Sequence, residues 1–103
     1  MHKDLRTAWL LLMLRNGESY GYELRRELAA RAGQLDPAVM YRSLRDMERG
    51  GLITSRWMRS KAGPKRRVYD ITPTGRSALM RIAEDITGTR DAQNAFLAEL
   101  GER

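Results

Sequence analysis

Apolar residues near the start of the chain recur at helical spacing. Between residues 5 and 15 the intervals of three and four place one set on a single helical face: Leu5, Ala8, Trp9, Leu12 and Met13. Asn16-Gly17 follows, and both residue types tolerate the left-handed conformation common at helix C-termini. The pattern predicts a first helix over residues 5–15.

A capping signal predicts a second helix from about Tyr20 to Arg31. Ser19 is the candidate N-cap, because its hydroxyl can accept the backbone N–H near Tyr22. Gly33 ends the helix, and the core positions are Leu24, Leu28 and Ala32.

Asp36-Pro37 predicts a third helix that continues to Arg49. Asp caps free N–H groups, and Pro fits the first helical position, where no N–H bond is needed. One side of this helix is apolar and carries Met40, Leu44 and Met47. The other side carries Ala38, Tyr41, Arg42, Arg45 and Arg49. Such a helix suits groove reading in DNA, although an ordinary amphipathic surface helix with solvated arginines has the same pattern.

After Gly50-Gly51 the pattern changes from helical to extended. Residues 52–60 contain Ile, Thr, Trp and Met, and residues 66–71 read Arg-Arg-Val-Tyr-Asp-Ile. Between them lies the turn Ala62-Gly63-Pro64. These segments predict a β-hairpin with a basic tip.

Thr72-Pro73 begins a fourth helix by the same device of a capping residue before proline. Alternating steps of three and four predict a heptad seam along it: Leu79, Ile82, Ile86, Thr89, Gln93, Phe96 and Leu100. Whether Thr87-Gly88 divides this helix is left open, since an interior Gly costs about 1 kcal/mol relative to Ala.

Composition restricts the class of protein. The 103 residues suffice for one domain, and 42% hydrophobic with 31% charged residues fits neither a disordered chain nor a membrane protein. The absence of cysteine excludes disulfides, thiolate metal sites and a cysteine nucleophile. The apolar run at residues 8–14 is too short to span a membrane, and no export signal is visible. We therefore expect a cytoplasmic protein without membrane association.

No enzyme is expected from the distribution of chemically active residues. The only histidine is His2, close to the start of the chain, and Asp4, Asp85 and Asp91 stand apart from any histidine or nucleophile pattern. We expect no catalytic residue, no metal and no cofactor.

The positive charge is concentrated in one segment. Six basic residues and no acidic one lie between residues 56 and 67, while the other 13 Lys and Arg equal the 13 Asp and Glu in number. This segment therefore holds the whole formal net charge of +6. A basic hairpin beside a helix with donors on its outer face favours contact with nucleic-acid phosphates over a merely solvated loop.

The predicted order of helix, helix, capped helix, basic hairpin and helix is that of a winged helix-turn-helix. The fold class is mainly α with a small β-hairpin, in which the third helix enters the major groove and the hairpin tip lies along the neighbouring backbone. We expect a DNA-binding domain over residues 1–72 and a C-terminal dimerisation helix over residues 73–103.

Four separated blocks carry a family resemblance: Ser-Tyr-Gly-Tyr-Glu-Leu at 19–24, Met-Tyr-Arg-Ser-Leu-Arg-Asp-Met-Glu at 40–48, Gly-Leu-Ile at 51–53 and Arg-Val-Tyr-Asp-Ile-Thr-Pro-Thr-Gly at 67–75. With these blocks the chain resembles the PadR family of bacterial transcriptional regulators, and its single C-terminal helix is similar to the smaller subgroup. The resemblance covers roughly residues 5–79. The chain departs from the family around the third-helix tyrosine, where Met40 and Arg42 replace the usual Leu and a Pro or small residue.

The resemblance implies a dimeric winged-helix repressor that binds a palindromic operator in double-stranded DNA. It also implies a small-molecule effector at the dimer interface whose binding releases the operator. By the same analogy Tyr41 faces DNA, while Tyr20 and Tyr22 open the second helix.

The expected site residues fall into two groups. The DNA contacts are Ser19, Tyr20, Ala38, Tyr41, Arg42, Arg45, Lys61, Lys65, Arg66 and Arg67. The dimer interface is formed by Trp9, Leu79, Ile82, Ile86, Phe96 and Leu100. Tyr22, Trp57 and Tyr69 are expected to have packing roles. The alternative function is an interaction module that uses the same seam and basic face to bind protein or RNA.

Overall fold

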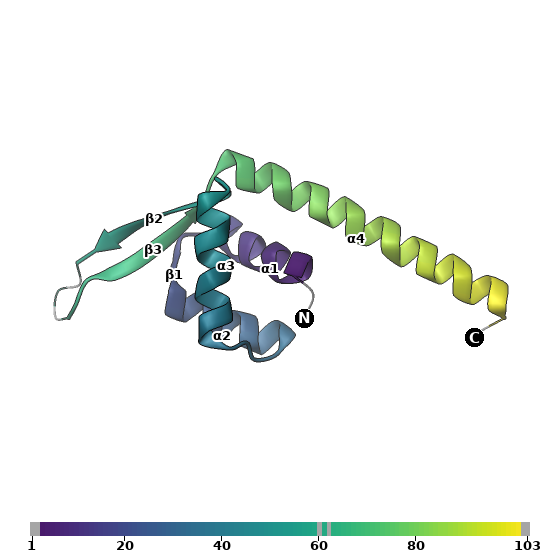
Figure 1. Cartoon of the computed structure of the whole chain (residues 1–103), viewed down its shortest axis with the longest axis horizontal. Helices are drawn as coiled ribbons and strands as arrows, with labels where there is room; N and C mark the ends of the chain where they lie inside the picture. The colour runs from purple at the N-terminus through teal and green to yellow at the C-terminus, as the bar shows by residue number, and fades with distance from the viewer. Residues whose placement is uncertain (1–2, 60, 62, 102–103) are drawn as a thin grey trace.

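The computed structural model describes residues 3–59, 61 and 63–101. Along the chain the elements are α1 (Lys3–Arg15), β1 (Ser19–Tyr20), α2 (Gly21–Ala32), α3 (Pro37–Arg49), β2 (Ile53–Met58), β3 (Arg66–Ile71) and α4 (Pro73–Leu100) (Figure 1). The expected class, mainly α with a small β-hairpin, is confirmed. His2, the strand end at Ser60 and the turn residue Ala62 lie outside the described residues.

The core forms where α1, α2 and α3 meet the base of the sheet. Its fully buried side chains are Leu10, Leu11, Leu14, Leu24, Leu28, Met40, Leu44 and Ile53. The expected core positions of α3 are thus buried, and so are Leu24 and Leu28 of α2. Ala32 is only partly covered at the edge of this cluster.

Of the five residues that the spacing in α1 picked out, Met13 is buried, but the helix otherwise turns a different face to the core. Leu10, Leu11 and Leu14 point into the core, whereas Leu5 is exposed and Trp9 is only partly buried. Because residues 8–14 of α1 are all apolar, intervals of three and four fit more than one face of this part of the helix. The second apolar face is left to meet α4.

The start of α2 corrects the predicted Ser19 cap. Ser19 and Tyr20 form the short strand β1, which pairs antiparallel with β3 through Ser19↔Tyr69 and Tyr20↔Val68. Tyr20 occupies the N-cap position and makes no side-chain capping bond, while the Ser19 hydroxyl donates a long 3.5 Å bond to the Tyr20 carbonyl. A two-residue strand has too little pattern to be read from sequence, so the hairpin becomes a three-stranded sheet in the order β1-β3-β2.

The predicted cap of α3 is confirmed. Asp36 Oδ1 accepts the Ala38 N–H at 2.8 Å, and Pro37 occupies the first turn. The wing, defined here as β2, β3 and their connection, follows directly. Its strands pair antiparallel from Ile53↔Ile71 to Met58↔Arg66.

Thr72 fixes the junction between β3 and α4. Its Oγ1 accepts the Gly75 N–H at 2.9 Å and donates to the Gly51 carbonyl, which lies 2.6 Å away. Gly75 is pressed against the loop before β2, where a Cβ would collide with the Leu52 carbonyl oxygen. The capping signal at Thr72 therefore also ties α4 to the base of the wing.

Helix α4 runs unbroken from Pro73 to Leu100, so Gly88 does not divide it. Ala78 and Leu79 are buried and Ile82 is half-buried, but every residue from Ala83 to Leu100 is exposed. Figure 1 shows the helix leaving the domain as a single rod on the side away from the wing tip. The molecule measures 60 × 27 × 21 Å as a result. Among the described residues, no helix has the length and apolar character needed to cross a membrane.

Candidate nucleic-acid interface

The outer side of α3 is open to solvent beside the wing. Ala38, Arg42 and Arg45 are exposed, and Tyr41 is half-buried. Arg49, at the end of the same side, pairs with Asp46 across 3.4 Å. The face predicted from helical spacing is therefore accessible, and its Arg42 and Arg45 form no ion pair with any described side chain.

A pocket of about 490 Å³ lies between the start of α2, the middle of α3 and β3. It is called the tyrosine pocket here, because all four tyrosines of the chain line it. Its lining residues are Tyr20, Gly21, Tyr22, Glu23, Tyr41, Arg66, Arg67 and Tyr69. Four residues of the predicted DNA contact set, from three different elements, are thus brought together in one place.

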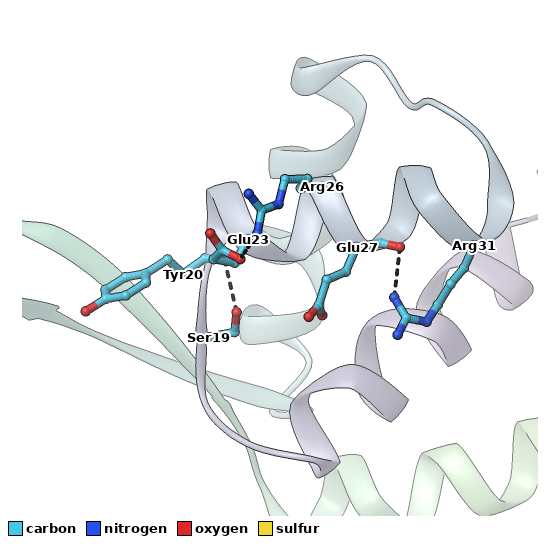
Figure 2. Close-up of polar contacts among 6 residues, drawn as sticks. All are labelled: Ser19, Tyr20, Glu23, Arg26, Glu27 and Arg31. Atoms are coloured by element: carbon cyan, nitrogen blue, oxygen red, sulfur yellow. Dashed lines mark hydrogen bonds and ion pairs between the residues drawn. The ribbon is translucent and has the colours of Figure 1, made fainter.

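Gly21 makes room for the Tyr41 ring in this pocket. A Cβ added at Gly21 would lie only 2.8 Å from Tyr41 Cε1, closer than real side chains approach. On the other wall the Arg66 guanidinium lies 5.6 Å from the centroid of the Tyr20 ring, within the range of a cation–π contact. Figure 2 shows the Tyr20 side chain reaching past the N-terminal end of α2.

Tyr69 and Tyr22 have opposite environments. Tyr69 is buried, with 7% of its surface exposed, as expected for a packing residue. Burial raises the pKa of the Tyr69 phenol, an effect that the nearby Arg67 charge partly opposes. Tyr22 is 63% exposed, so its expected packing role is wrong; its ring lies 6.0 Å from the Arg26 guanidinium.

The exposed side of α2 carries its own polar contacts (Figure 2). Glu23 and Arg26 form an ion pair of 3.1 Å, and the Arg31 guanidinium donates to the Glu27 carbonyl at 3.2 Å. The Glu23 carboxylate itself lines the tyrosine pocket, and its ion pair with Arg26 partly offsets its negative charge there. The cations that line the pocket are Arg66 and Arg67.

A chain of polar contacts joins the wing to α3. The Ser55 hydroxyl lies 2.7 and 2.9 Å from the two carboxylate oxygens of Glu48 and accepts a 2.8 Å bond from Arg67 Nε. Arg67 also approaches Glu48 at 3.9 Å and lies 5.3 Å from the centroid of the Trp57 ring. Trp57 is 61% exposed and does not pack in the core, so its expected structural role is limited to supporting Arg67.

Two of the six wing cations are neutralised within the chain. Arg67 is held by Glu48, and Arg56 pairs with Glu18 at 2.9 Å. The remaining cations, Arg59, Lys61, Lys65 and Arg66, are exposed and form no ion pair with any described side chain. Free positive charge is therefore concentrated at the wing tip and at the rim of the tyrosine pocket.

The expected dimer residues divide into covered and exposed members. Leu79 is buried against the chain's own core, and Ile82 and Trp9 are half-buried at its edge. Ile86, Phe96 and Leu100 are exposed, as are Met80 and Leu97, which the heptad pattern did not include. An apolar groove of about 350 Å³ between α1 and α4, the α1–α4 groove, is lined by Leu5, Ala8, Trp9, Leu12, Leu79 and Ile86 among others.

Ser19 stands apart from the other predicted DNA contacts, because it is half-buried in β1 and does not line the tyrosine pocket. Sequence reasoning also missed four residues near the interface: Glu18, Gly21, Glu48 and Ser55. One of these contacts left a weak signal in the sequence. Glu48 and Ser55 are seven residues apart, one near the end of a predicted helix and the other in the strand that follows, so the two side chains could have been expected to meet. Among the described residues no group of three His, Cys, Asp or Glu is placed to hold a metal.

The fold defines a winged helix-turn-helix protein of the regulator class. It has three helices followed by a β-hairpin wing beside the third helix, and an accessible outer face on that helix. Residues 10–81 match the model of the Transcriptional regulator PadR-like family, and the chain belongs to this family.

Two relatives from Mycobacterium tuberculosis are similar to the chain in sequence. Rv1176c, a probable transcriptional regulator, is 32% identical over 98 residues, which cover 91% of this chain and 52% of the relative. The transcriptional regulator Rv3488 is 38% identical over 64 residues, covering 62% of this chain and 59% of the relative. The chain thus spans between half and three-fifths of the length of these relatives.

Solved structures share the fold. A PadR family transcription regulator from Clostridium difficile R20291 superimposes with a TM-score of 0.82 at 26% identity, covering 89% of this chain and 97% of that one. Bacillus subtilis PadR, solved in complex with operator DNA, gives a TM-score of 0.65 at 24% identity over 75% of this chain and 45% of its own. The winged helix-turn-helix fold with a long C-terminal helix is confirmed by these likenesses.

Proposed function

We propose that this PadR-family protein is a dimeric, sequence-specific repressor that binds a palindromic operator in double-stranded DNA. The observation that carries the proposal is the exposed α3 face with Arg42 and Arg45, bordered by the tyrosine pocket and the unpaired cations of the wing. The operator complex of the related B. subtilis protein supports the choice of DNA as partner.

Helix α3 is assigned to the major groove. An α-helix with its side chains is about 10–12 Å across, and the major groove of B-DNA is about 12 Å wide. With α3 in the groove, Ala38 permits close approach near the helix N-terminus, while Tyr41 and Arg45 reach toward base edges. Arg can donate to guanine O6 and N7, a contact worth about 1–3 kcal/mol of discrimination.

Backbone phosphates are assigned to the tyrosine pocket and the wing tip. The pocket opens at the start of α2, where free N–H groups and the helix dipole favour an anion, and the Arg66 guanidinium lies at its rim. The buried, neutral Tyr69 phenol and the Tyr20 hydroxyl add uncharged donors. Lys61 and Lys65 extend the contact along the neighbouring backbone.

Dimerisation is assigned to the exposed apolar stripe of α4, with Ile86, Phe96 and Leu100 as its main members. A helix that leaves its domain with large apolar side chains in solvent needs a covering partner, and a second α4 supplies one by symmetry. Two α3 helices would then lie about 34–36 Å apart, one turn of duplex. Residues 1–72 act as the DNA-binding unit and residues 73–103 as the dimerisation unit.

The α1–α4 groove is the proposed site of a small-molecule effector at the dimer interface. Its wall is apolar and includes Trp9, and a second subunit would close its open side. A flat apolar compound bound there would change the separation of the two α3 helices and release the operator. Catalysis, a cofactor and a membrane have no part in this cytoplasmic function.

The test begins with selection of bound fragments from genomic DNA, followed by binding titrations with the selected duplex. Arg45→Ala should relax sequence preference, whereas Lys65→Ala with Arg66→Ala should weaken all duplexes alike and flatten the dependence of affinity on salt. If both variants bind operator and random DNA like the parent, these roles are wrong. Preference for RNA or a protein over duplex DNA would instead support an interaction module.

A repressor also has to lower transcription. A reporter promoter that contains the selected duplex should lose activity when the chain is expressed and regain it with Arg45→Ala. An increase in reporter activity with the parent chain would overturn the repressor assignment while leaving DNA binding intact.

A further inference from the structure

A second basic hollow lies on the flank of α3 that faces away from the wing. It has a volume of about 350 Å³ and lies between the first turns of α1 and α3. Its polar lining consists of Arg6, Thr7, Arg42, Ser43 and Asp46. We call it the Arg6 notch. Arg6, on α1, belongs to no site described so far.

Arg6 is held in a fixed orientation at this place. Its Nε donates to the Ser43 hydroxyl at 2.8 Å, and Ser43 is a buried polar residue on α3. A guanidinium carries five N–H donors in a planar fork, so this single bond leaves the four Nη donors for a ligand. The anchor therefore orients the Arg6 fork without using it.

The charge of the notch favours an anion. Arg6 and Arg42 form no ion pair with any described side chain, whereas Asp46, the acid of the notch, is already paired with Arg49 at 3.4 Å. A planar guanidinium fork matches the geometry of a phosphate and can bind two of its oxygens at once. Two such groups around one hollow fit a phosphodiester better than a carboxylate or a neutral ligand.

The position of the notch relative to α3 indicates which phosphate it would meet. Helical spacing places Tyr41 and Glu48 on the wing side of α3, and Glu48 contacts the wing through Ser55. Arg42 and Asp46 lie on the opposite flank, with Arg6 beside them. Since a helix fills the width of the major groove, each flank of α3 faces the backbone of one DNA strand.

We propose that the Arg6 notch binds a backbone phosphate of the DNA strand opposite the wing. Arg6 and Arg42 grip its two non-bridging oxygens, and Ser43 positions Arg6. The inference rests on the proposed function and refines it, because Arg42 is assigned to the backbone and not to a base edge. The duplex is then held on both sides of α3: by the wing and tyrosine pocket on one, and by the notch on the other.

The experiment measures affinity for a random-sequence duplex of 30 base pairs by fluorescence anisotropy at several salt concentrations. The full-length parent is compared with Arg6→Met, Arg42→Met and, as a matched removal of charge, Arg81→Met. Arg81 is exposed on α4 and is not a member of its apolar stripe. Circular dichroism melting of each variant shows whether it is folded.

Arg6→Met and Arg42→Met should each lower the slope of log affinity against log salt, by up to about 0.9, the value for one neutralised phosphate. Arg81→Met should keep the parent slope. Arg6→Lys should keep the slope but bind several-fold more weakly, because Lys retains the charge without the fork. A purely structural Arg6 would lower the melting temperature and leave the slope unchanged.

Unchanged slopes in folded Arg6→Met and Arg42→Met would overturn the inference while the proposed function stands. So would an Arg42→Met variant that loses affinity for the selected operator alone, since that marks a base contact. If Arg6→Met does not fold, the slope of Arg42→Met decides whether the inference holds. Arg42 is exposed, so its substitution leaves the core intact. A folded parent that binds no duplex DNA overturns the proposed function and this inference together.

Discussion

The hydroxyl of Ser55, on β2, lies 2.7 Å from Oε1 and 2.9 Å from Oε2 of Glu48, on α3. This contact joins the first wing strand to the helix that we assign to the major groove. The same hydroxyl accepts Arg67 Nε, so one serine links a carboxylate on the helix to a guanidinium on the second wing strand. The angle between wing and α3 is therefore set by side-chain chemistry as well as by the short connection between them.

Ser55→Ala should loosen this link. It removes the bonds to Glu48 and Arg67 and leaves two partly exposed charges 3.9 Å apart. We expect the free energy of unfolding to fall by about 1 kcal/mol, the usual net value of a hydrogen bond to a partly solvated group. Urea denaturation measures the change. Ser77→Ala, on an exposed position of α4, is the control and should cost nothing. Equal stabilities for both variants would show that the link contributes little.

Two glycines of α4 should respond to alanine in opposite directions. At Gly75 a Cβ would collide with the Leu52 carbonyl oxygen and lie 2.8 Å from Ile71 Cγ1, whereas at Gly88 nothing lies within 4 Å. Gly75→Ala should destabilise the fold by about 1–3 kcal/mol through overpacking. Gly88→Ala should stabilise it by about 0.5–1 kcal/mol, because Ala loses less conformational entropy in a helix. Thermal melts of the two variants and the parent give the sign of each change in stability. A stabilised Gly75→Ala variant would contradict the close approach of Gly75 to the Leu52 carbonyl.

Tyr69 should make stability depend on alkaline pH. Its pKa is raised by burial above the usual 10.0, so the folded chain keeps the phenol proton longer than the unfolded chain does. The unfolded state therefore binds fewer protons above pH 10, and stability falls as pH rises from there through the folded pKa. Below pH 10 this contribution is fully present and constant.

Tyr69→Phe isolates that contribution from the other groups that titrate in base. The stability of the parent relative to Tyr69→Phe should be constant from about pH 7 to 9 and decline above about pH 10, as measured by urea denaturation at each pH. A difference that stays level through about pH 11 would mean that the phenol titrates alike in the folded and unfolded chain.

Signals local to a few residues were enough to predict most of the fold. Asp36-Pro37 and Thr72-Pro73 located two helix starts, because a cap and a proline act within one turn. Ser19 failed as a cap since pairing with β3, fifty residues away, holds it in a strand. The burial of Leu10 and Leu11 was missed for a related reason: residues 8–14 of α1 are all apolar, so only the packing partners decide which face is covered.

The candidate site was predictable in its residue types and not in its contacts. The helical period of the sequence predicts the outer residues of α3, and its charge distribution predicts the basic wing. The structure has both at the predicted positions. The tyrosine pocket requires Gly21 to face Tyr41, and no local pattern carries that information. Likewise Arg67 was predicted as a DNA contact from its charge, although in the fold its guanidinium lies beside Glu48 and the Trp57 ring.

Substitutions on α4 should test the proposed dimer without touching the folded domain. Phe96 and Leu100 are 64% and 65% exposed, and they lie on the apolar stripe far beyond the last buried residue, Leu79. Phe96→Glu with Leu100→Glu places four like charges at a two-fold interface, so we expect monomers in analytical ultracentrifugation at concentrations where the parent is dimeric. Far-UV circular dichroism should still report a folded winged helix, because these side chains contribute nothing to the core.

The matched control is Ala95→Glu with Ala98→Glu, which adds the same charge to the opposite side of α4 at exposed positions. Glu and Ala are both good helix formers, so this control should remain dimeric. Monomers from the stripe variant alone would place the interface on that side. Dimers from both variants would contradict the assigned seam, and monomers from both would mean that net charge, not the apolar stripe, governs association. Since each half-site contributes binding energy only when the subunits are joined, the monomeric variant should also lose most of its preference for the operator over random DNA.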